Sequence, residues 1–370
     1  MVADNDSPPM NRIPNPRQPN SFKPSFLAAA VFLSSMRMAS AAEPPPPFGA
    51  VPHERQVAWQ RMEYYGFVHF GLNTWTDLEW GYGDEDEKLF DPASFDARAI
   101  VRHFKEAGMK GLILTAKHHD GFCLWPTKST SHNIAKSRWK KGKGDVLKEF
   151  ASACQAEGMK FGLYVSPWDR NHAEYGRDGY VAAYHQQLRE VLTNYGPVFE
   201  IWFDGANGGD GYYGGAREER TISDGYYQFP EAAAMIRELQ PGCVIWGAGD
   251  ARWGGSEQGD VGYPQWHTMD STKPGNVATG VRHGDLWVPA EGDVSIRPGW
   301  FWHESEDMQV RPPENLLQIW FDCVGRGAVS GVRSALHRDL LQQIHKCHSF
   351  RIYDTYEFRP PCEPACRFAP

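Results

Sequence analysis

The chain has 370 residues, of which 41% are hydrophobic and 13% aromatic, and its formal net charge is −8. This length can hold one barrel of about 250 residues with additions, and the acidic balance argues against nucleic acid or anionic membranes as partners. The 14 tryptophans suggest a sugar-binding function, because aromatic rings commonly cover the C–H-rich faces of sugars.

The N-terminal segment has the pattern of a secretory signal peptide. Basic residues precede the apolar stretch 26–33, and the small residues Ala39-Ser40-Ala41 follow it, as at a cleavage site. The apolar stretch is too short to span a bilayer as a stable helix. We therefore expect residues 1–41 to be removed, with Met10 as a possible true start, and residues 42–52 to form a proline-rich linker. The mature protein is then expected to be secreted or periplasmic, with no membrane partner.

Four short apolar runs each end on polar side chains suited to chemistry. Continuous apolar runs are typical of strands that are buried on both faces, and parallel barrels place their catalytic groups where such strands end. The sequence therefore predicts an enzyme built on a (β/α)8 TIM barrel. The runs with their polar ends are Phe67-Val68 before His69, Gly111-Leu112-Ile113-Leu114 before His118-His119-Asp120, Phe161-Gly162-Leu163-Tyr164-Val165 before Ser166-Pro167-Trp168-Asp169, and Glu200-Ile201-Trp202-Phe203 before Asp204.

Two segments repeat the order helix, glycine and strand. Apolar residues with helical spacing lead into residues 106–110, and a second set leads in the same way into residues 156–160. Gly108 and Gly158 stand where a helix end needs a positive φ, and a buried strand follows within about three residues. Such helical crossovers require parallel strands. The alternative is an open doubly wound sheet, which is weakened because no glycine fingerprint of the dinucleotide-binding type follows the first strand.

The C-terminal part of the predicted barrel departs from this pattern. A helix is predicted over residues 312–322, but from Val329 onward no buried strand is apparent and the chain ends in proline-rich sequence. We therefore expect a barrel over residues 53–328 that is incomplete at its last strand, followed by an atypical tail over residues 329–370.

Asp204 is the strongest catalytic candidate. It directly follows an apolar strand and opens the glycine-rich stretch Gly205-Ala206-Asn207-Gly208, which lets a ligand approach closely. An acid in this position can act as a nucleophile toward an anomeric carbon. The structural alternative is an Asx turn that closes the strand.

A glycosidase needs a second carboxyl group to protonate the leaving oxygen. Glu257 lies in a polar loop after the predicted strand Cys243 to Trp246, and Glu291 lies in the segment Val288 to Trp300. Sequence alone cannot measure the distance of either glutamate from Asp204. Either could instead be a solvated surface acid or an ion-pair partner.

The strand-end histidines allow two interpretations. His118 and His119 are adjacent, so they can face one ligand only if the strand has already ended and turned. A barrel metal site would more naturally use His-x-His, which this strand lacks. We therefore favour hydrogen bonds from His69, His118 and His119 to sugar hydroxyls and expect no metal and no cofactor.

The seven cysteines are an odd number, so at least one is unpaired. No zinc-type CxxC pair occurs among them. Cys154 and Cys243 have the surroundings of small buried hydrophobic residues.

From about Pro52 to Ala328 the chain resembles the α-L-fucosidases of glycoside hydrolase family 29. Several independent motifs in the same order carry this resemblance. They are His69-Phe70-Gly71, Glu79-Trp80, Lys117-His118-His119-Asp120-Gly121-Phe122, Tyr164-Val165-Ser166-Pro167-Trp168, Trp202-Phe203-Asp204-Gly205 and Pro289-Ala290-Glu291-Gly292-Asp293-Val294-Ser295-Ile296-Arg297-Pro298-Gly299-Trp300.

The resemblance implies a retaining exo-hydrolase that removes terminal α-L-fucose from glycans without a metal. Asp204 would be its nucleophile. The Arg252-Trp253 segment resembles the branch that cuts α-1,3 and α-1,4 linkages, which points to Glu257 as the acid/base, with Glu291 as the alternative. Glu291 would otherwise be a structural or subsite residue, and the alternative for Arg252 is a salt bridge at the barrel rim. The residues implied to hold the fucose are His69, Glu79, Trp80, His118, His119, Tyr164, Trp202 and Arg252.

The chain also departs from this family. After Gly325-Arg326-Gly327-Ala328 relatives continue into an apolar strand and usually a C-terminal β-sandwich, neither of which is apparent here. Loss of a closing strand would expose sheet edges. Two other classes therefore stay open: a fucose-binding protein without catalysis, and a metal-dependent barrel hydrolase.

Overall fold

The computed structural model describes residues 46–273 and 275–335. Its main sheet has eight strands in the order β7-β4-β3-β2-β1-β12-β11-β8, and every pairing in it is parallel. The strands are β1 (Tyr64–His69), β2 (Gly111–Lys117), β3 (Lys160–Val165), β4 (Val198–Trp202), β7 (Val244–Trp246), β8 (Arg252–Trp253), β11 (Ala290–Ser295) and β12 (Val329–Ala335).

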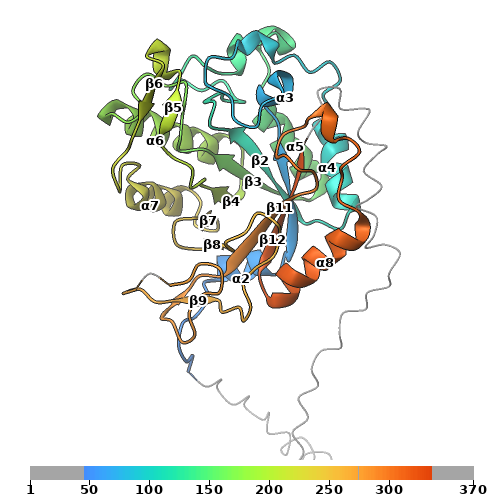
Figure 1. Cartoon of the computed structure of the whole chain (residues 1–370), viewed down its shortest axis with the longest axis vertical. Helices are drawn as coiled ribbons and strands as arrows, with labels where there is room; N and C mark the ends of the chain where they lie inside the picture. The colour runs from blue at the N-terminus through green and yellow to red at the C-terminus, as the bar shows by residue number, and fades with distance from the viewer. Residues whose placement is uncertain (1–45, 274, 336–370) are drawn as a thin grey trace, which may run out of the picture. The chain divides into compact units, whose positions relative to one another are not determined.

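The sheet curls into a nearly closed barrel. β1 pairs with β2 on one side and with β12 on the other, so the first and last strands lie side by side. At the remaining seam, Trp246 and Ala251 form an isolated parallel bridge just before β8. Figure 1 shows the strands gathered in the centre with α6 and α7 on one flank and α4, α5 and α8 on the other. The predicted TIM barrel is confirmed, and the doubly wound alternative is wrong because its end strands would not pair.

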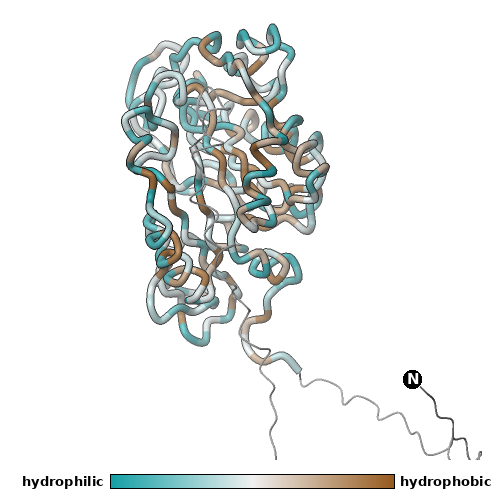
Figure 2. The backbone as a smooth tube through the Cα atoms, turned by 90° about the vertical axis from the view of Figure 1, so that its right-hand side faces the viewer, coloured by the Kyte–Doolittle hydropathy of each residue, from teal (hydrophilic) through white to brown (hydrophobic). Residues whose placement is uncertain are grey.

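Helices connect most successive strands. The predicted helix-glycine-strand repeats are α4 with β2 and α5 with β3, and Gly108 and Gly158 have φ values of +82° and +69°. Side chains of Asp96 and Asp145 accept hydrogen bonds from backbone N–H groups in the first turns of α4 and α5. In Figure 2 the coils of the helices change between hydrophilic (teal) and hydrophobic (brown) residues, as expected for helices that pack one face on a core. The helices are α2 (Glu54–Gln60), α3 (Asn73–Thr76), α4 (Ala97–Glu106), α5 (Val146–Glu157), α6 (Asp178–Asn194), α7 (Phe229–Leu239) and α8 (Pro313–Cys323).

The barrel interior is filled by side chains at every second strand position, as the pleat requires. On β4 these are Glu200 and Trp202, and Asp204 continues the series beyond the end of the strand. A buried cluster forms the middle of the interior: Tyr65, Phe67, Ile113, Tyr164, Trp202, Val244, Trp246 and Val329. The polar residues that follow β1 to β4 therefore surround one mouth of the barrel.

The expectation of a missing last strand is wrong. β12 pairs with β1 over Tyr64–His69 and with β11 over Glu291–Ser295, and the barrel thus extends past residue 328. Its sequence, Val-Ser-Gly-Val-Arg-Ser-Ala, is not a continuous apolar run. The strand is held by its two neighbours and by a buried charge at Arg333, which is 4% exposed.

Two small antiparallel sheets lie in the loops: β5 (Gly209–Gly211) with β6 (Glu218–Arg220), and β9 (Thr268–Met269) with β10 (Leu286–Trp287). Among the described residues no helix is both long and apolar enough to cross a membrane. Cys154 and Cys243 are buried free thiols, as expected, and Cys123 and Cys323 are free and buried as well. The predicted signal peptide, the linker up to residue 45 and the tail from residue 336 lie outside the described residues.

Candidate active site

Asp204 lies just beyond β4, with both carboxylate oxygens held. The Tyr164 hydroxyl donates to Oδ2 at 2.8 Å, and the Ala206 backbone N–H donates to Oδ1 at 2.7 Å. The hydrogen bond from Ala206 forms an Asx turn, which the sequence offered as the structural alternative for Asp204. The side chain is nevertheless 22% exposed, so the turn orients the carboxylate without closing it off from a ligand.

His119 faces Asp204 with a defined tautomer. Its Nδ1 is 2.7 Å from Ser166 Oγ, and the Ser166 hydroxyl donates to the Trp168 carbonyl at 2.8 Å. The hydroxyl proton is thus used, so Nδ1–H must donate to Ser166 and Nε2 keeps a lone pair. Nε2 lies 3.9 Å from Asp204 Oδ2. A hydroxyl group between these two atoms could donate to either.

The three histidines are neutral at physiological pH. Burial lowers the pKa of His119 to about 4, against the opposing charge of Asp204. Burial also lowers the pKa values of His69 and His118 well below their usual value, with Arg333 contributing. β2 ends at Lys117, so the chain has left the strand before His118 and His119. Their ring centroids can therefore lie 4.2 Å apart. Neutral imidazoles suit hydrogen bonds with sugar hydroxyls, although they could also ligate a metal.

Aromatic rings form the wall beneath these groups. Tyr164 stacks between His118 and Trp202, with ring centroids at 5.6 and 5.3 Å, and Trp202 stacks on Trp246 at 3.6 Å. His69 contacts Phe301 edge to face, and both its nitrogens lack hydrogen-bond partners among the described residues. Two unsatisfied buried donors or acceptors at a barrel mouth are suited to a polar ligand.

Arg333 at the end of β12 is a component that the sequence did not reveal. Its guanidinium lies over Trp300, Phe67 and Trp202 at 4.0, 4.5 and 5.0 Å from the ring centroids. It forms a buried ion pair with Asp293 Oδ2 at 3.1 Å. The sequence signal for Asp293 was its place in the Pro289 to Trp300 motif, whereas Arg333 follows no motif that could have indicated it.

The two candidate acids lie in different environments. Glu257 is exposed, and the adjacent Gln258 bridges to Val294 of β11. Partial burial raises the pKa of Glu257, and Asp293 and Asp204 contribute through their negative charges. The negative charge of Asp204 therefore contributes to the raised pKa of Glu257, and Glu257 remains accessible to solvent, as a general acid must.

Glu291, by contrast, is fully buried in the barrel interior. Its Oε1 accepts a hydrogen bond from Trp202 Nε1 at 3.3 Å, so the indole lies between it and the layer of Asp204. Glu200 is another interior neighbour, and it accepts a hydrogen bond from Trp59 at 2.7 Å. Burial raises the pKa of Glu291 to about 7 and that of Glu200 well above its usual value. Burial thus favours the protonated, neutral forms of these two carboxyl groups, in a setting that suits a structural role.

Glu79 and Trp80 border the same mouth. Trp80 is 49% exposed and contacts His119 edge to face at 5.1 Å. Glu79 accepts hydrogen bonds from the backbone N–H groups of Trp300 and Phe301 and from His303. His303 was not identified from the sequence; burial acts against its protonation, but hydrogen bonds to Asp77 and Glu79 raise its pKa.

Arg252 lies apart from this group. Its neighbour Trp253 donates to Asp293 at 2.9 Å, so Arg252 points to the opposite face of β8. There its guanidinium donates to backbone carbonyls of Val277, Trp266 and Val288. The guanidinium thus anchors the loop between β8 and β11 on the face of β8 opposite to Trp253.

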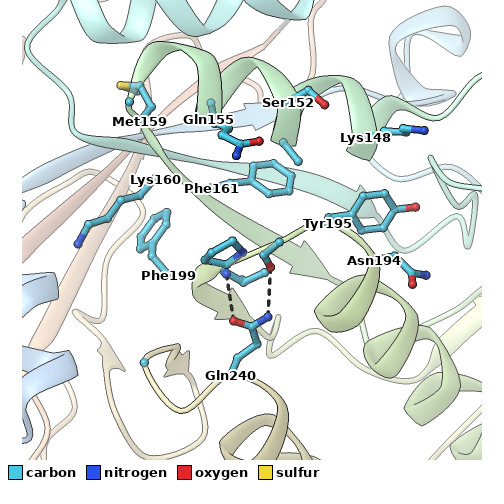
Figure 3. Close-up of a pocket in the computed structure, with 17 residues that line it drawn as sticks. Lys148, Ser152, Gln155, Met159, Lys160, Phe161, Asn194, Tyr195, Phe199 and Gln240 are labelled. Carbon is cyan, nitrogen blue, oxygen red and sulfur yellow. Dashed lines mark hydrogen bonds between the residues drawn. The ribbon is translucent and has the colours of Figure 1, made fainter.

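A pocket of about 810 Å³ lies elsewhere, beside the start of β3 and the ends of α5 and α6. Figure 3 shows its residues, among them Gln240 with two hydrogen bonds. Gln240 accepts from Val198 N and donates to the carbonyls of Leu192 and Gly196. Its polar groups are therefore used to hold backbone, and the pocket lies at the strand starts rather than at the strand ends, where barrel enzymes have their active sites.

Comparison with known proteins identifies the family. Residues 49–330 match the α-L-fucosidase family model. The chain belongs to the α-L-fucosidase family. It is 42% identical over 295 residues to α-L-fucosidase 1 of Arabidopsis thaliana and 43% identical over 302 residues to a putative α-L-fucosidase 1 of Oryza sativa subsp. japonica. These alignments cover 77% and 78% of this chain and 56% of each relative, so the chain spans about half the length of the curated relatives it matches.

Solved structures agree with this assignment. A glycoside hydrolase 29 family member from an unknown rumen bacterium is 50% identical with a TM-score of 0.78, over 80% of this chain and 55% of that one. A Ruminococcus gnavus fucosidase of the same family, solved in complex with fucose, is 31% identical with a TM-score of 0.73, over 85% of this chain and 70% of that one. The (β/α)8 barrel of this chain is thus the fold of the glycoside hydrolase family that the motifs indicated.

Proposed function

We propose that the protein is a retaining exo-α-L-fucosidase that releases terminal α-L-fucose from glycans, with α-1,3 and α-1,4 linkages as its substrates. The observation that carries this proposal is the geometry of Asp204, an accessible carboxylate held by Tyr164 and Ala206 and faced by the neutral imidazole of His119. Family membership and the fucose complex of the Ruminococcus gnavus relative support the choice of sugar.

In the proposed mechanism, Asp204 attacks C1 of fucose while Glu257 gives its proton to the departing glycosidic oxygen. This step breaks the C1–O bond and forms an ester between fucose and Asp204. Glu257 then removes a proton from water, which attacks C1, releases fucose and regenerates the carboxylate of Asp204. Two displacements at one carbon retain the anomeric configuration.

The sugar would be held by the groups around the barrel mouth. His69, His118 and His119 would bind its hydroxyl groups, and the rings of Trp80, Tyr164 and Trp202 would cover its apolar face. Glu79 would position the Trp300 segment and contact a hydroxyl group with its remaining lone pairs. We assign no sugar contact to Arg252, since its guanidinium already binds loop carbonyls and Gln265.

The decisive test uses azide with an aryl α-L-fucoside. Asp204→Ala should lose at least about 10³-fold in turnover, and azide should restore it by entering from the vacated face, giving β-L-fucosyl azide. Wild-type hydrolysis followed by NMR should first release the α anomer of fucose. Release of the β anomer from the wild type, or no rescue of the variant, would reject the retaining mechanism.

The same experiment separates catalysis from simple recognition. A fucose-binding protein without catalysis would bind fucose in calorimetry and leave every fucoside intact. Comparison of an aryl fucoside with branched oligosaccharides that carry α-1,2-, α-1,3- or α-1,4-linked fucose tests the linkage proposal.

We also propose that the protein is exported, on the basis of the predicted signal within residues 1–41. N-terminal sequencing of protein recovered from the culture medium or periplasm would show a start near Ala42 or Glu43 if this is correct.

A further inference from the structure

A second cluster of ligand-type side chains lies outside the candidate active site. Glu85, Asp120 and His132 come from three different segments, and one ligand atom of each lies within 4.8 Å of the others. Asp120 and His132 are each 2% exposed. Residues this far apart in sequence, brought together in the interior, need something that compensates their polar groups.

His132 is oriented like a metal-binding imidazole. Its Nδ1 is 2.9 Å from Glu87 Oε1, and its Nε2 has no hydrogen-bond partner among residues 46–273 and 275–335. Metal-ligating histidines commonly use one ring nitrogen for a carboxylate, which fixes the ring, and the other nitrogen for the ion. The imidazole is thus held by Glu87 and has one buried nitrogen left for a ligand.

Asn73 supplies an additional oxygen. It is fully buried, and its Oδ1 has no hydrogen-bond partner within the described part of the chain. A Cβ placed on Gly81 would lie 2.7 Å from this oxygen and 2.8 Å from both Glu85 Oε1 and Asp120 Cβ. Two acceptor oxygens, from Asn73 and Glu85, therefore lie close to the Asp120 side chain in the interior.

Backbone groups hold the Glu85 carboxylate in place. Backbone N–H groups of Tyr82 and Gly83 donate to the two oxygens of Glu85 at 2.6 and 2.9 Å. Asp120 is buried, so a bound cation would compensate the charge of its carboxylate in the interior.

We propose that Glu85, Asp120, His132 and Asn73 form a structural site for a divalent first-row transition-metal ion, Mn²⁺ or Zn²⁺. One imidazole nitrogen with carboxylate and amide oxygens suits these ions better than Ca²⁺, which prefers oxygen ligands alone. Asp120 directly follows His118 and His119, so the ion would tie the end of β2 to the loop at Glu85 and to the segment at His132. Its function would be to hold the imidazole pair, with no part in bond cleavage.

The test measures metal binding by the full chain, independently of activity. After dialysis against a chelator, Mn²⁺ or Zn²⁺ at about 100 times its Kd should raise the Tm by roughly 5 °C, and Ca²⁺ should do so less. Asp120→Asn and His132→Gln should each weaken binding at least 10-fold in titration calorimetry. Glu190→Gln is the matched control, since Glu190 is a partly buried carboxylate that bonds to Trp125 and Lys128 outside the cluster, and it should bind like the wild type.

Crystallography provides a second measurement if the variants do not fold. Anomalous scattering from crystals soaked in Mn²⁺ should place a peak about 2.2 Å from His132 Nε2 and close to Glu85 and Asp120. No peak and no Tm shift, wild-type affinity in both variants, or a peak only at His69 and His118, would each overturn the proposal. None of these results would alter the fucosidase proposal, which is tested by product configuration.

Discussion

Glu257 and Glu291 are both glutamates that the sequence offers as partners for Asp204, but their surroundings separate their roles. Glu257 is exposed and senses Asp204, whereas Glu291 is buried behind Trp202. Glu257→Gln should lower kcat/KM about 10²- to 10⁴-fold for a fucosylated oligosaccharide, because the leaving sugar needs a proton. An aryl fucoside with an acidic phenol as leaving group needs no proton from the enzyme, so its kcat/KM should fall only slightly.

The measurement is kcat/KM over a series of aryl fucosides plotted against the pKa of the leaving phenol. The slope should become steeper in Glu257→Gln and should keep its wild-type value in Glu291→Gln, which makes the same chemical change at the buried site. An unchanged slope in Glu257→Gln would remove that residue from the acid/base role.

Ser166 is a positioning residue through its contact with His119. Its oxygen accepts the Nδ1–H proton, which leaves the Nε2 lone pair facing Asp204. Ser166→Ala should free the ring to take the other tautomer and should raise KM about 5- to 10-fold, the value of one hydrogen bond, with a smaller change in kcat. Ser166→Thr keeps the hydroxyl and should restore KM. Equal KM values in all three proteins would show that the tautomer is not fixed by this contact.

At the scale of elements, β11 and β12 are joined by a charge pair inside the barrel. Arg333 and Asp293 are both at least 95% buried and lie 3.1 Å apart. Arg333→Met should lower the free energy of unfolding by about 3–5 kcal/mol, because it leaves the Asp293 carboxylate buried without its cation. The measurement is urea unfolding of each variant at pH 7.

The double variant Arg333→Met/Asp293→Asn is the control for this pair. The introduced asparagine keeps an oxygen for the Trp253 indole N–H, which donates to Asp293 at 2.9 Å in the wild type, but carries no charge. The double variant should therefore recover a large part of the stability lost in Arg333→Met. If the two substitutions were simply additive, the ion pair would not be the source of the loss.

The same elements explain which parts of the fold could be predicted. β1 to β4 and β7 are apolar runs, since their inward and outward residues are mostly hydrophobic, and the sequence indicated them. β11 and β12 place Glu291, Asp293 and Arg333 inward, and their burial depends on partners that lie far away in sequence. No local sequence pattern indicates such pairing, so the sequence predicts neither β12 nor the role of Arg333. The histidines and Asp204 were found because their position at strand ends is itself a local pattern.

At the scale of the whole molecule, the carboxyl pair in the barrel interior links stability to pH. Glu200 on β4 and Glu291 on β11 are both fully buried, and their neighbours Trp59 and Trp202 each donate to one oxygen of the pair. Burial raises the pKa of Glu291 to about 7 and that of Glu200 well above its usual value, so the folded barrel retains a proton that the unfolded chain, with ordinary glutamate pKa values of about 4.3, has released by pH 7. A folded-state pKa raised for an acid means that stability is full below the unfolded pKa and is lost as pH rises through the folded pKa.

Glu200→Gln should weaken this dependence. It removes the carboxyl group of Glu200, whose raised pKa acts together with that of Glu291, and the introduced side-chain amide can still accept from Trp59. From about pH 5 to pH 8 the free energy of unfolding should fall less in the variant than in the wild type, by more than about 1 kcal/mol. Urea unfolding of both proteins at these two pH values measures this difference. Effects of His119 and Asp120 are common to both proteins and cancel. Parallel pH profiles for the two proteins would show that the interior pair holds no proton.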